Sequence, residues 1–290
     1  MASLAYHAPA SLHEAVKLLE ADPTARVLAG GTDLIVQMRS GRVLPGAVID
    51  LKRIADIAGV RELPGGGFAI GAATPCTALK DHAGLAASWP GVVEAANLIG
   101  SVQVRNRATM AGNLCNASPA ADSVPALIAA GAIAVVIGPA GTREVPAEAI
   151  ASGPGRTTLA PGEVVAEIRL PARPAGGGDA YLRLIPRTEM DIAVVGVGAA
   201  LVLAADGTCT AARVALGAVA ATALLVPEAG AALVGTKLDD AALAAMAAAA
   251  CAAARPIDDK RGSAAYRTAM AGVLAQRAVL IAAARAGEKA

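Results

Sequence analysis

The most informative stretch of this sequence is Leu28-Ala29-Gly30-Gly31-Thr32-Asp33-Leu34, which lies between a short β-like run and an apolar helical segment. Two adjacent glycines let the backbone turn sharply, so that several N–H groups can point the same way. The start of the following helix adds the positive end of its dipole, and Thr32 adds a hydroxyl donor. Strand, glycine turn and helix together predict a nest for an anion such as phosphate. From these residues alone, an ordinary tight turn is the alternative interpretation.

A second stretch with similar properties lies roughly 80 residues further along the chain. The segment 105–122 is rich in Gly, Asn, Ser and Thr, and we expect it to be a loop. Its small side chains allow close approach of the backbone to a flat polar ligand, and its Ser, Asn and Asp groups suit hydroxyls and phosphate oxygens. The two stretches together predict a site for a dinucleotide with two phosphates. Two unrelated surface turns are the alternative.

Composition excludes several classes of protein. The 290 residues include 25 Lys and Arg against 24 Asp and Glu, and this net charge of +1 argues against a nucleic-acid-binding protein. Aromatic residues make up 2% of the chain, which also argues against a platform for stacking bases. A hydrophobic content of 55% excludes a disordered chain, and the length fits two domains.

A mean hydropathy of +0.54 raises the question of a membrane protein. About a quarter of the chain is Ala, which raises this index without adding bulky lipid-facing side chains. The longest uncharged apolar runs, 192–205 and 241–254, have 14 residues, short of the roughly 18 that a spanning helix needs. We therefore predict no membrane span, and residues Met1–Leu4 do not begin a recognisable secretory signal.

Histidines and cysteines are few and scattered, so we predict neither a hydrolytic nor a metal site. None of the three histidines lies in a recognisable motif, and no two cysteines form a C-x-x-C pair, which excludes zinc and iron–sulfur motifs in this chain. Cys115 lies inside the second stretch, with no base nearby in the sequence, and we interpret it as a packing residue. A cytoplasmic, reducing location fits this cysteine usage best.

Hydrophobic periodicity and turn residues predict that the order of strands and helices changes at a Pro- and Gly-rich linker over residues 171–178. Before the linker, strands and short helices alternate. After it, three strands are followed by two Ala-rich helices, which is typical of a separate α+β domain. We expect strands at 26–29, 48–51, 67–71, 133–137, 142–145, 162–170, 180–185, 193–204 and 209–216, and helices at 12–19, 34–39, 77–87, 91–99, 123–130, 241–254 and 263–284.

At the two ligand-binding stretches the chain resembles a known family. The segments 28–34, 103–113 (QVRNRATMAGN) and 116–122 (NASPAAD) are similar to those of the FAD-binding medium subunit of molybdenum hydroxylases. That group includes carbon monoxide dehydrogenase, xanthine dehydrogenase and aldehyde oxidase. Further on, the segment 261–267 (RGSAAYR) resembles the start of the last helix in that subunit's C-terminal domain. The resemblance covers nearly the whole chain in the expected order.

The resemblance implies an α+β protein with the FAD-binding fold of the vanillyl-alcohol-oxidase type. Its FAD-binding domain would span 1–177, with two α+β subdomains at 1–56 and 57–177. A C-terminal α+β domain, with a three-stranded antiparallel sheet and helices, would span 178–290. The cofactor would be FAD, bound non-covalently.

The resemblance also implies roles for individual residues. The turn at 28–34 would hold the FAD diphosphate, and Asp122 would accept hydrogen bonds from FAD hydroxyls. The residues that would contact FAD are Leu28, Ala29, Gly30, Gly31, Thr32, Asp33, Leu34, Ile99, Thr109, Gly112, Asn113, Asp122 and Ile192. Relatives usually have two glycines before the asparagine, whereas Ala111 is the first of that pair here. A Cβ is tolerable there if φ is negative, but it would crowd the cofactor if φ is positive.

In this family the flavin chain is one of several subunits. The resemblance implies a large molybdopterin-binding partner, a small partner with two [2Fe–2S] clusters, and assembly as a dimer of heterotrimers. The molybdenum cofactor and the clusters would lie in those partners only. This chain would pass electrons through FAD to an external acceptor. The alternatives are a stand-alone FAD-dependent reductase of the same fold and a non-redox nucleotide-binding assembly subunit.

Overall fold

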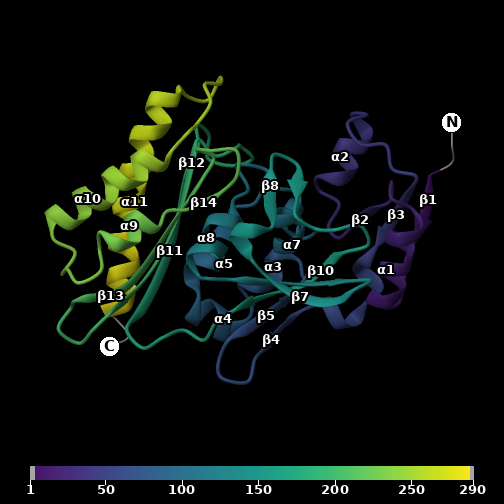
Figure 1. Ribbon diagram of the computed structural model, residues 1–290, viewed down its shortest axis with the longest axis horizontal. Helices are drawn as coiled ribbons and strands as arrows, with labels where there is room; N and C mark the ends of the chain where they lie inside the picture. Colours follow the sequence, from purple (N-terminus) through teal and green to yellow (C-terminus); the bar gives the residue numbers. More distant parts are fainter. Residues whose placement is uncertain (1–3, 288–290) are drawn as a thin grey trace.

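The computed structural model describes residues 4–287, and its three larger sheets follow one another along the long axis of the molecule (Figure 1). Residues 1–3 and 288–290, which belong to the domains expected at 1–177 and 178–290, lie outside the described residues. One hydrophobic core joins the first two sheets, and a second core lies between the third sheet and the C-terminal helices.

The first sheet has three parallel strands in the order β1-β3-β2. Parallel strands need crossover connections, and α1 supplies the first of them. Its N-terminus is capped by Ser11, whose hydroxyl accepts a hydrogen bond from the Glu14 N–H. The elements of this subdomain are β1 (Ala5–His7), α1 (Leu12–Ala21), β2 (Arg26–Leu28), α2 (Leu34–Arg39) and β3 (Ala47–Asp50).

The second sheet has five antiparallel strands in the order β4-β5-β10-β6-β7, and short helices cover it. These strands are β4 (Val60–Glu62), β5 (Phe68–Gly71), β6 (Ile133–Gly138), β7 (Gly141–Pro146) and β10 (Val164–Leu170). The α-helices are α3 (Cys76–Leu79), α4 (Ala83–Ser88), α5 (Pro90–Asn97), α6 (Val102–Arg105), α7 (Met110–Cys115) and α8 (Ser123–Ala129). A small ribbon, β8 (Ala151–Gly153) with β9 (Arg156–Thr157), and three 3₁₀ turns, η1 (Leu51–Arg53), η2 (Ala55–Ile57) and η3 (Ala147–Ala149), complete this part.

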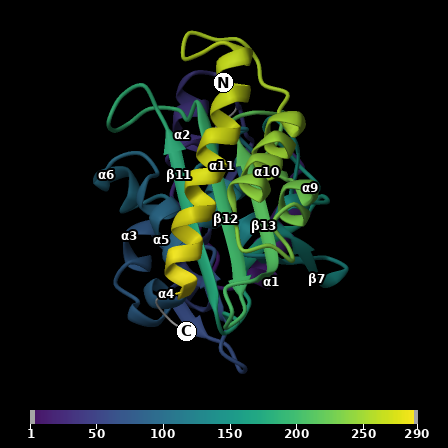
Figure 2. The same ribbon diagram turned by 90° about the vertical axis from the view of Figure 1, so that its left-hand side faces the viewer.

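The third sheet is antiparallel, in the order β11-β12-β13-β14, and it has a helical layer on each face. Figure 2 shows α10 and α11 in front of β11, β12 and β13, while α5 and α8 of the preceding domain contact the sheet as well. The elements are β11 (Gly177–Leu184), β12 (Val195–Leu203), β13 (Cys209–Gly217), β14 (Leu224–Leu225), α9 (Pro227–Ala231), α10 (Asp240–Ala253) and α11 (Ala264–Gly287).

Several expected elements differ from the structure. The expected loop at 105–122 contains helix α7, which has Gly112 and Asn113 in its middle. The Thr109 hydroxyl accepts a hydrogen bond from the Gly112 N–H and so caps the start of this helix. The single helix expected at 77–87 is two helices, since the His82 ring nitrogen Nδ1 caps a new one at Leu85 N. The C-terminal sheet also gains a fourth strand, β14, which is only two residues long.

The expected linker at 171–178 ends earlier than predicted, because its last two glycines already belong to strand β11. A Cβ on Gly178 would lie 1.8 Å from the Ala282 carbonyl oxygen of α11. On the next strand, a Cβ on Gly198 would lie 2.3 Å from the Pro125 carbonyl oxygen of α8. Glycine therefore brings the backbones of helix and sheet together on both faces.

Helix α11 is long and apolar enough, by length and composition, to cross a bilayer. In this structure one of its faces is buried among the residues of the second core, where Leu274, Val279 and Ala282 pack against the sheet. Its apolar character is thus explained by packing inside the C-terminal domain.

We expect Gly178→Ala to destabilise the protein by roughly 1–3 kcal/mol or more, because the added methyl must push α11 away from β11. Urea unfolding measures this change. Gly287→Ala is the matched control, since a Cβ at that position has no atom within 4 Å. Equal unfolding midpoints for the two variants would contradict the close packing.

Candidate functional site

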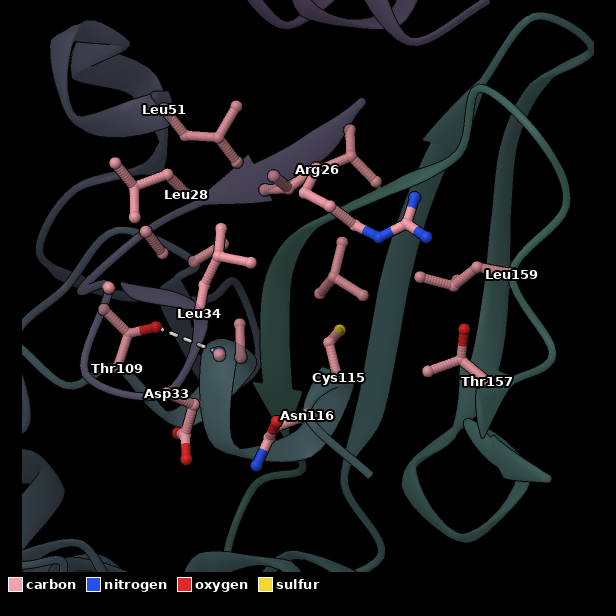
Figure 3. Close-up of a pocket in the computed structure, with 18 of the residues that line it drawn as sticks. Arg26, Leu28, Asp33, Leu34, Leu51, Thr109, Cys115, Asn116, Thr157 and Leu159 are labelled. Atoms are coloured by element: carbon pink, nitrogen blue, oxygen red, sulfur yellow. Dashed lines mark hydrogen bonds between the residues drawn. The ribbon is translucent and has the colours of Figure 1, made fainter. Parts of the chain in front are cut away.

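A recess of about 630 Å³ lies where the first two sheets meet, which is within the size range of small-molecule sites. Figure 3 shows Leu28, Thr109 and Asp33 on one side and Arg26, Thr157 and Leu159 on the other, with Cys115 and Asn116 between them. The wall includes nearly every residue expected to bind the cofactor: Leu28, Ala29, Gly30, Gly31, Thr32, Asp33, Leu34, Ile99, Thr109, Gly112 and Asn113. Asp122 and Ile192 are not part of this wall.

The two ligand-binding stretches touch each other at Gly30. A Cβ on this residue would lie 2.0 Å from the Arg107 carbonyl oxygen and 2.9 Å from the Ala108 Cα. No side chain fits such a distance, so only glycine allows the turn to lie against the backbone of the second stretch. The convergence predicted from the sequence is therefore present, and it is made by direct backbone contact.

The glycine turn leads directly into α2. Gly31 has φ +78°, a conformation that favours glycine, and its carbonyl accepts the first hydrogen bond of the helix, from the Ile35 N–H at 3.1 Å. The N–H groups before Ile35 precede this first helical bond, which is the usual position of unsatisfied donors at a helix start. The Asp33 side chain makes no capping bond and keeps an exposed surface, although the surrounding protein raises its pKa.

Helix α7 forms the part of the wall next to the turn. The side-chain oxygen Oδ1 of Asn113 accepts hydrogen bonds from the Ser123 N–H at 3.2 Å and from the Ser123 hydroxyl at 2.7 Å, which orients the Asn113 amide. Ala111, where relatives usually have glycine, lies inside this helix and is 6% exposed. Ala111 is not one of the described non-glycine residues that have a positive φ. The condition under which its Cβ is tolerated is therefore met.

Asp122 lies at the junction with the C-terminal domain. Its carboxylate accepts a hydrogen bond from Arg183 Nη1 at 3.0 Å and a longer one from the Tyr181 hydroxyl at 3.4 Å. The same Arg183 nitrogen donates to the Leu98 carbonyl at 2.8 Å, next to Ile99 of the recess. Burial is the main influence on this carboxyl group and raises its pKa to about 6, against the lowering effect of Arg183.

Ile192 is 52% exposed and belongs to a loop that the segment 261–267 holds in place. Arg267 Nη2 donates to Asp259 Oδ1 at 2.6 Å, and that oxygen also accepts from the Arg261 N–H at 2.8 Å. Arg261 Nε then donates to Asp191 Oδ1 at 3.1 Å. The sequence resemblance identified this segment, and the structure shows that it ties the start of α11 to the loop before β12.

Several residues of the recess wall belong to no recognisable sequence motif. Gln37 Nε2 donates to Asn116 Oδ1 at 2.9 Å and so links α2 to the end of α7. The one local signal for Gln37 is its place in LIVQMR, where every residue but Gln37 and Arg39 is apolar. Arg26 of β2 and the segment 155–165 also line the recess. The segment 155–165 is far from both stretches in sequence and leads into β10, which pairs with β5 and β6.

The side chains of the recess are suited to binding a ligand and not to catalysing a reaction themselves. Burial raises the pKa of the Cys115 thiol to about 12, so it is a poor nucleophile at neutral pH. Within residues 4–287, no group of three or more His, Cys, Asp or Glu side chains could hold a metal ion. Backbone donors, amides and small side chains dominate the middle of the wall.

The fold and the recess together suit an elongated, polar ligand held where the first two sheets meet. Two family models match the chain: "FAD binding domain in molybdopterin dehydrogenase" over residues 2–173, and "CO dehydrogenase flavoprotein C-terminal domain" over residues 180–282. The chain belongs to the FAD-binding medium chains of the molybdenum hydroxylases.

Individual relatives agree with this family. The carbon monoxide dehydrogenase medium chain of Afipia carboxidovorans is 40% identical over 98% of both chains. The structure of reconstituted CO dehydrogenase from Oligotropha carboxidovorans has a TM-score of 0.94 and 40% identity, covering 98% of each chain. Quinoline 2-oxidoreductase from Pseudomonas putida 86 has a TM-score of 0.89 and 31% identity over 98% of each chain. The chain is therefore an oxidoreductase subunit that carries FAD for electron transfer.

The pKa of Asp122 predicts a pH-dependent stability. Between its ordinary value of 3.8 and about 6, the folded protein holds a proton that the unfolded chain has lost, so raising the pH destabilises the fold. We expect the free energy of unfolding of the wild type, minus that of Asp122→Asn, to fall by on the order of 2–3 kcal/mol from pH 4 to pH 7. Urea titrations at several pH values measure it, and a constant or rising difference would contradict the shift.

Proposed function

We propose that this chain is the electron-exit subunit of a molybdenum-containing hydroxylase. A large partner would oxidise the substrate at a molybdopterin centre, and a small partner would relay electrons through [2Fe–2S] clusters to the FAD of this chain. An external acceptor would then take them. The observation that carries the proposal is the single recess built jointly by the glycine turn and the stretch around α7, because a diphosphate-bearing cofactor needs donors from both.

The residues present fit FAD. The peptide N–H groups of the turn at 28–34 would donate to the diphosphate, and Gly30 and Gly31 keep side chains out of the way. Beside the turn, Thr109, Gly112 and Asn113 would form the second FAD-binding loop. When bound, FAD supplies a redox centre that can accept and release electrons, and the protein sets its position and electrostatic environment.

Three further residues would act nearer to the flavin. Ile99 lies on the wall and offers an apolar surface. Asp122 retains acceptor lone pairs besides those used by Arg183 and Tyr181, and we assign it to FAD hydroxyls. Ile192, on the loop held by Arg261, would pack near the ring.

The domain limits, the assembly and the location are part of the same proposal. We assign 1–177 to the FAD-binding domain and 178–290 to the C-terminal domain, in line with the two matched segments. The complex would be a dimer of heterotrimers with no membrane span in this chain, in the cytoplasm. Relatives named as medium chains support a multi-subunit enzyme.

The stand-alone reductase is the second candidate function. The match of residues 180–282 to a CO dehydrogenase flavoprotein C-terminal domain favours the hydroxylase subunit. We expect the isolated, FAD-loaded chain to turn over neither a reduced nicotinamide with a small enone nor the substrate of the complex. Co-purification with two partners, combined with metal analysis, tests the assembly. Rapid turnover by the isolated chain would favour the reductase.

Flavin titration tests the cofactor site. We expect the wild-type chain to bind FAD and to become yellow, and Gly30→Ala to lose affinity because its Cβ forces the turn away from Arg107. A hydrogen bond to a charged group is worth roughly 1.5–3 kcal/mol, so losing one lowers the affinity roughly 10- to 100-fold. Gly287→Ala is the control for added methyl groups. If the wild-type chain is colourless once unbound FAD has been removed, the proposal is refuted and the non-redox assembly subunit is favoured.

The attachment of the flavin is a separate test. Cys115 is the one thiol on the recess wall, and its raised pKa disfavours the thiolate that a covalent bond would need. We therefore expect acid precipitation of the loaded protein to release all flavin into the supernatant. Yellow colour retained by the precipitated polypeptide would mean that the link is covalent.

A further inference from the structure

Lys52 stands directly behind the glycine turn. Its ammonium nitrogen Nζ lies 3.1 Å from the carbonyl oxygen of Ala29, the residue before Gly30. Lys52 belongs to η1, outside the recess wall, whereas both Ala29 and Gly30 are part of that wall. We propose that Lys52 is a positioning residue that orients the glycine turn for the diphosphate of the cofactor. This inference rests on the proposed FAD site.

The ammonium group is itself firmly held. Asp50 Oδ1 accepts hydrogen bonds from Lys52 Nζ at 2.6 Å and from the Lys52 N–H at 3.0 Å, while Asp50 Oδ2 accepts from the Tyr6 hydroxyl at 2.8 Å. Asp50 is 7% exposed, and Lys52 together with these hydrogen bonds lowers its pKa despite the opposing effect of burial. A carboxylate with three donors is a fixed anchor.

The anchor also has the right place in the sheet. Asp50 ends β3, the central strand, and pairs in register with Leu28 of β2. Leu28 is the last strand residue before the turn. The Lys52 side chain therefore links Asp50, on the central strand of the sheet, to Ala29, the first residue beyond β2.

Peptide geometry explains how a contact behind the turn acts at its front. The peptide between Ala29 and Gly30 is planar and trans, so its carbonyl and its N–H point in opposite directions. Holding the Ala29 oxygen with Lys52 therefore fixes the direction of the Gly30 N–H. Two glycines in a row have unusual backbone freedom, so a tether here removes entropy that cofactor binding would otherwise have to remove.

Charge alone does not explain the contact. The Lys52 ammonium is paired with Asp50 at 2.6 Å, which cancels most of its field at a distance, and its side chain is only 32% exposed. An ammonium has three donors, and two are used by Asp50 and Ala29. A positioning role predicts a loss of affinity that salt does not change, whereas long-range attraction is screened by salt.

The test is a set of FAD titrations on the full chain. Lys52→Met leaves the buried Asp50 carboxylate without its ammonium and could destabilise the fold, so Asp50→Asn/Lys52→Met is made beside it. We expect the double variant to bind FAD about tenfold more weakly than the wild type, with the unfolding midpoint of the flavin-free protein nearly unchanged. Lys52→Arg should restore part of the affinity, and Lys17→Met, on the exposed face of α1, is the control.

The outcomes separate the possible explanations. Binding of FAD by the double variant within twofold of the wild type overturns the inference while leaving the proposed function intact. A tenfold loss at low salt that vanishes at high salt also overturns it, because the effect would then be long-range attraction. A tenfold loss that persists at high salt supports it. If the wild-type chain itself binds no FAD, both the proposed function and this inference fail.

Discussion

The site depends on one backbone contact, the approach of Gly30 to the Arg107 carbonyl. It joins two segments that belong to different subdomains, and no side chain other than hydrogen fits between them. Because the turn is pressed against the second stretch, its N–H groups and the cap of α7 face one recess. Thr109, Asn113 and the Lys52 tether each fix one side of that arrangement, but none of them could bring the two segments together.

The same device recurs in the C-terminal domain, where Gly178 and Gly198 let helices lie directly on the sheet. An Ala-rich composition serves the same purpose along α10 and α11, since small side chains allow close packing at many points. This explains why a chain with one Phe and one Trp builds two separate cores. The high hydropathy follows from this packing mode.

Local signals made much of the fold predictable. The Ser11 cap, the hairpin of β6 and β7, and the strand–glycine–helix turn each depend on neighbouring residues, and all are present. Helix α7 was missed because Gly112 and Asn113 in its middle are typical of loops, and because its cap, Thr109, was not recognised. The part of the wall formed by 155–165 depends on strand pairing across the chain, for which the sequence holds no local sign. Asp122 was expected at the ligand, but its ion pair with Arg183 also depends on the domain junction.

The order in which the recess is completed follows the order of synthesis. Its wall begins at Leu19 and closes only with Val165 on β10, the strand that pairs with both β5 and β6 in the middle sheet. A nascent chain that has not yet reached β10 therefore contains both of the stretches proposed to bind FAD but lacks part of the recess wall. A complete recess therefore forms only after the first 165 or so residues have left the ribosome and folded together.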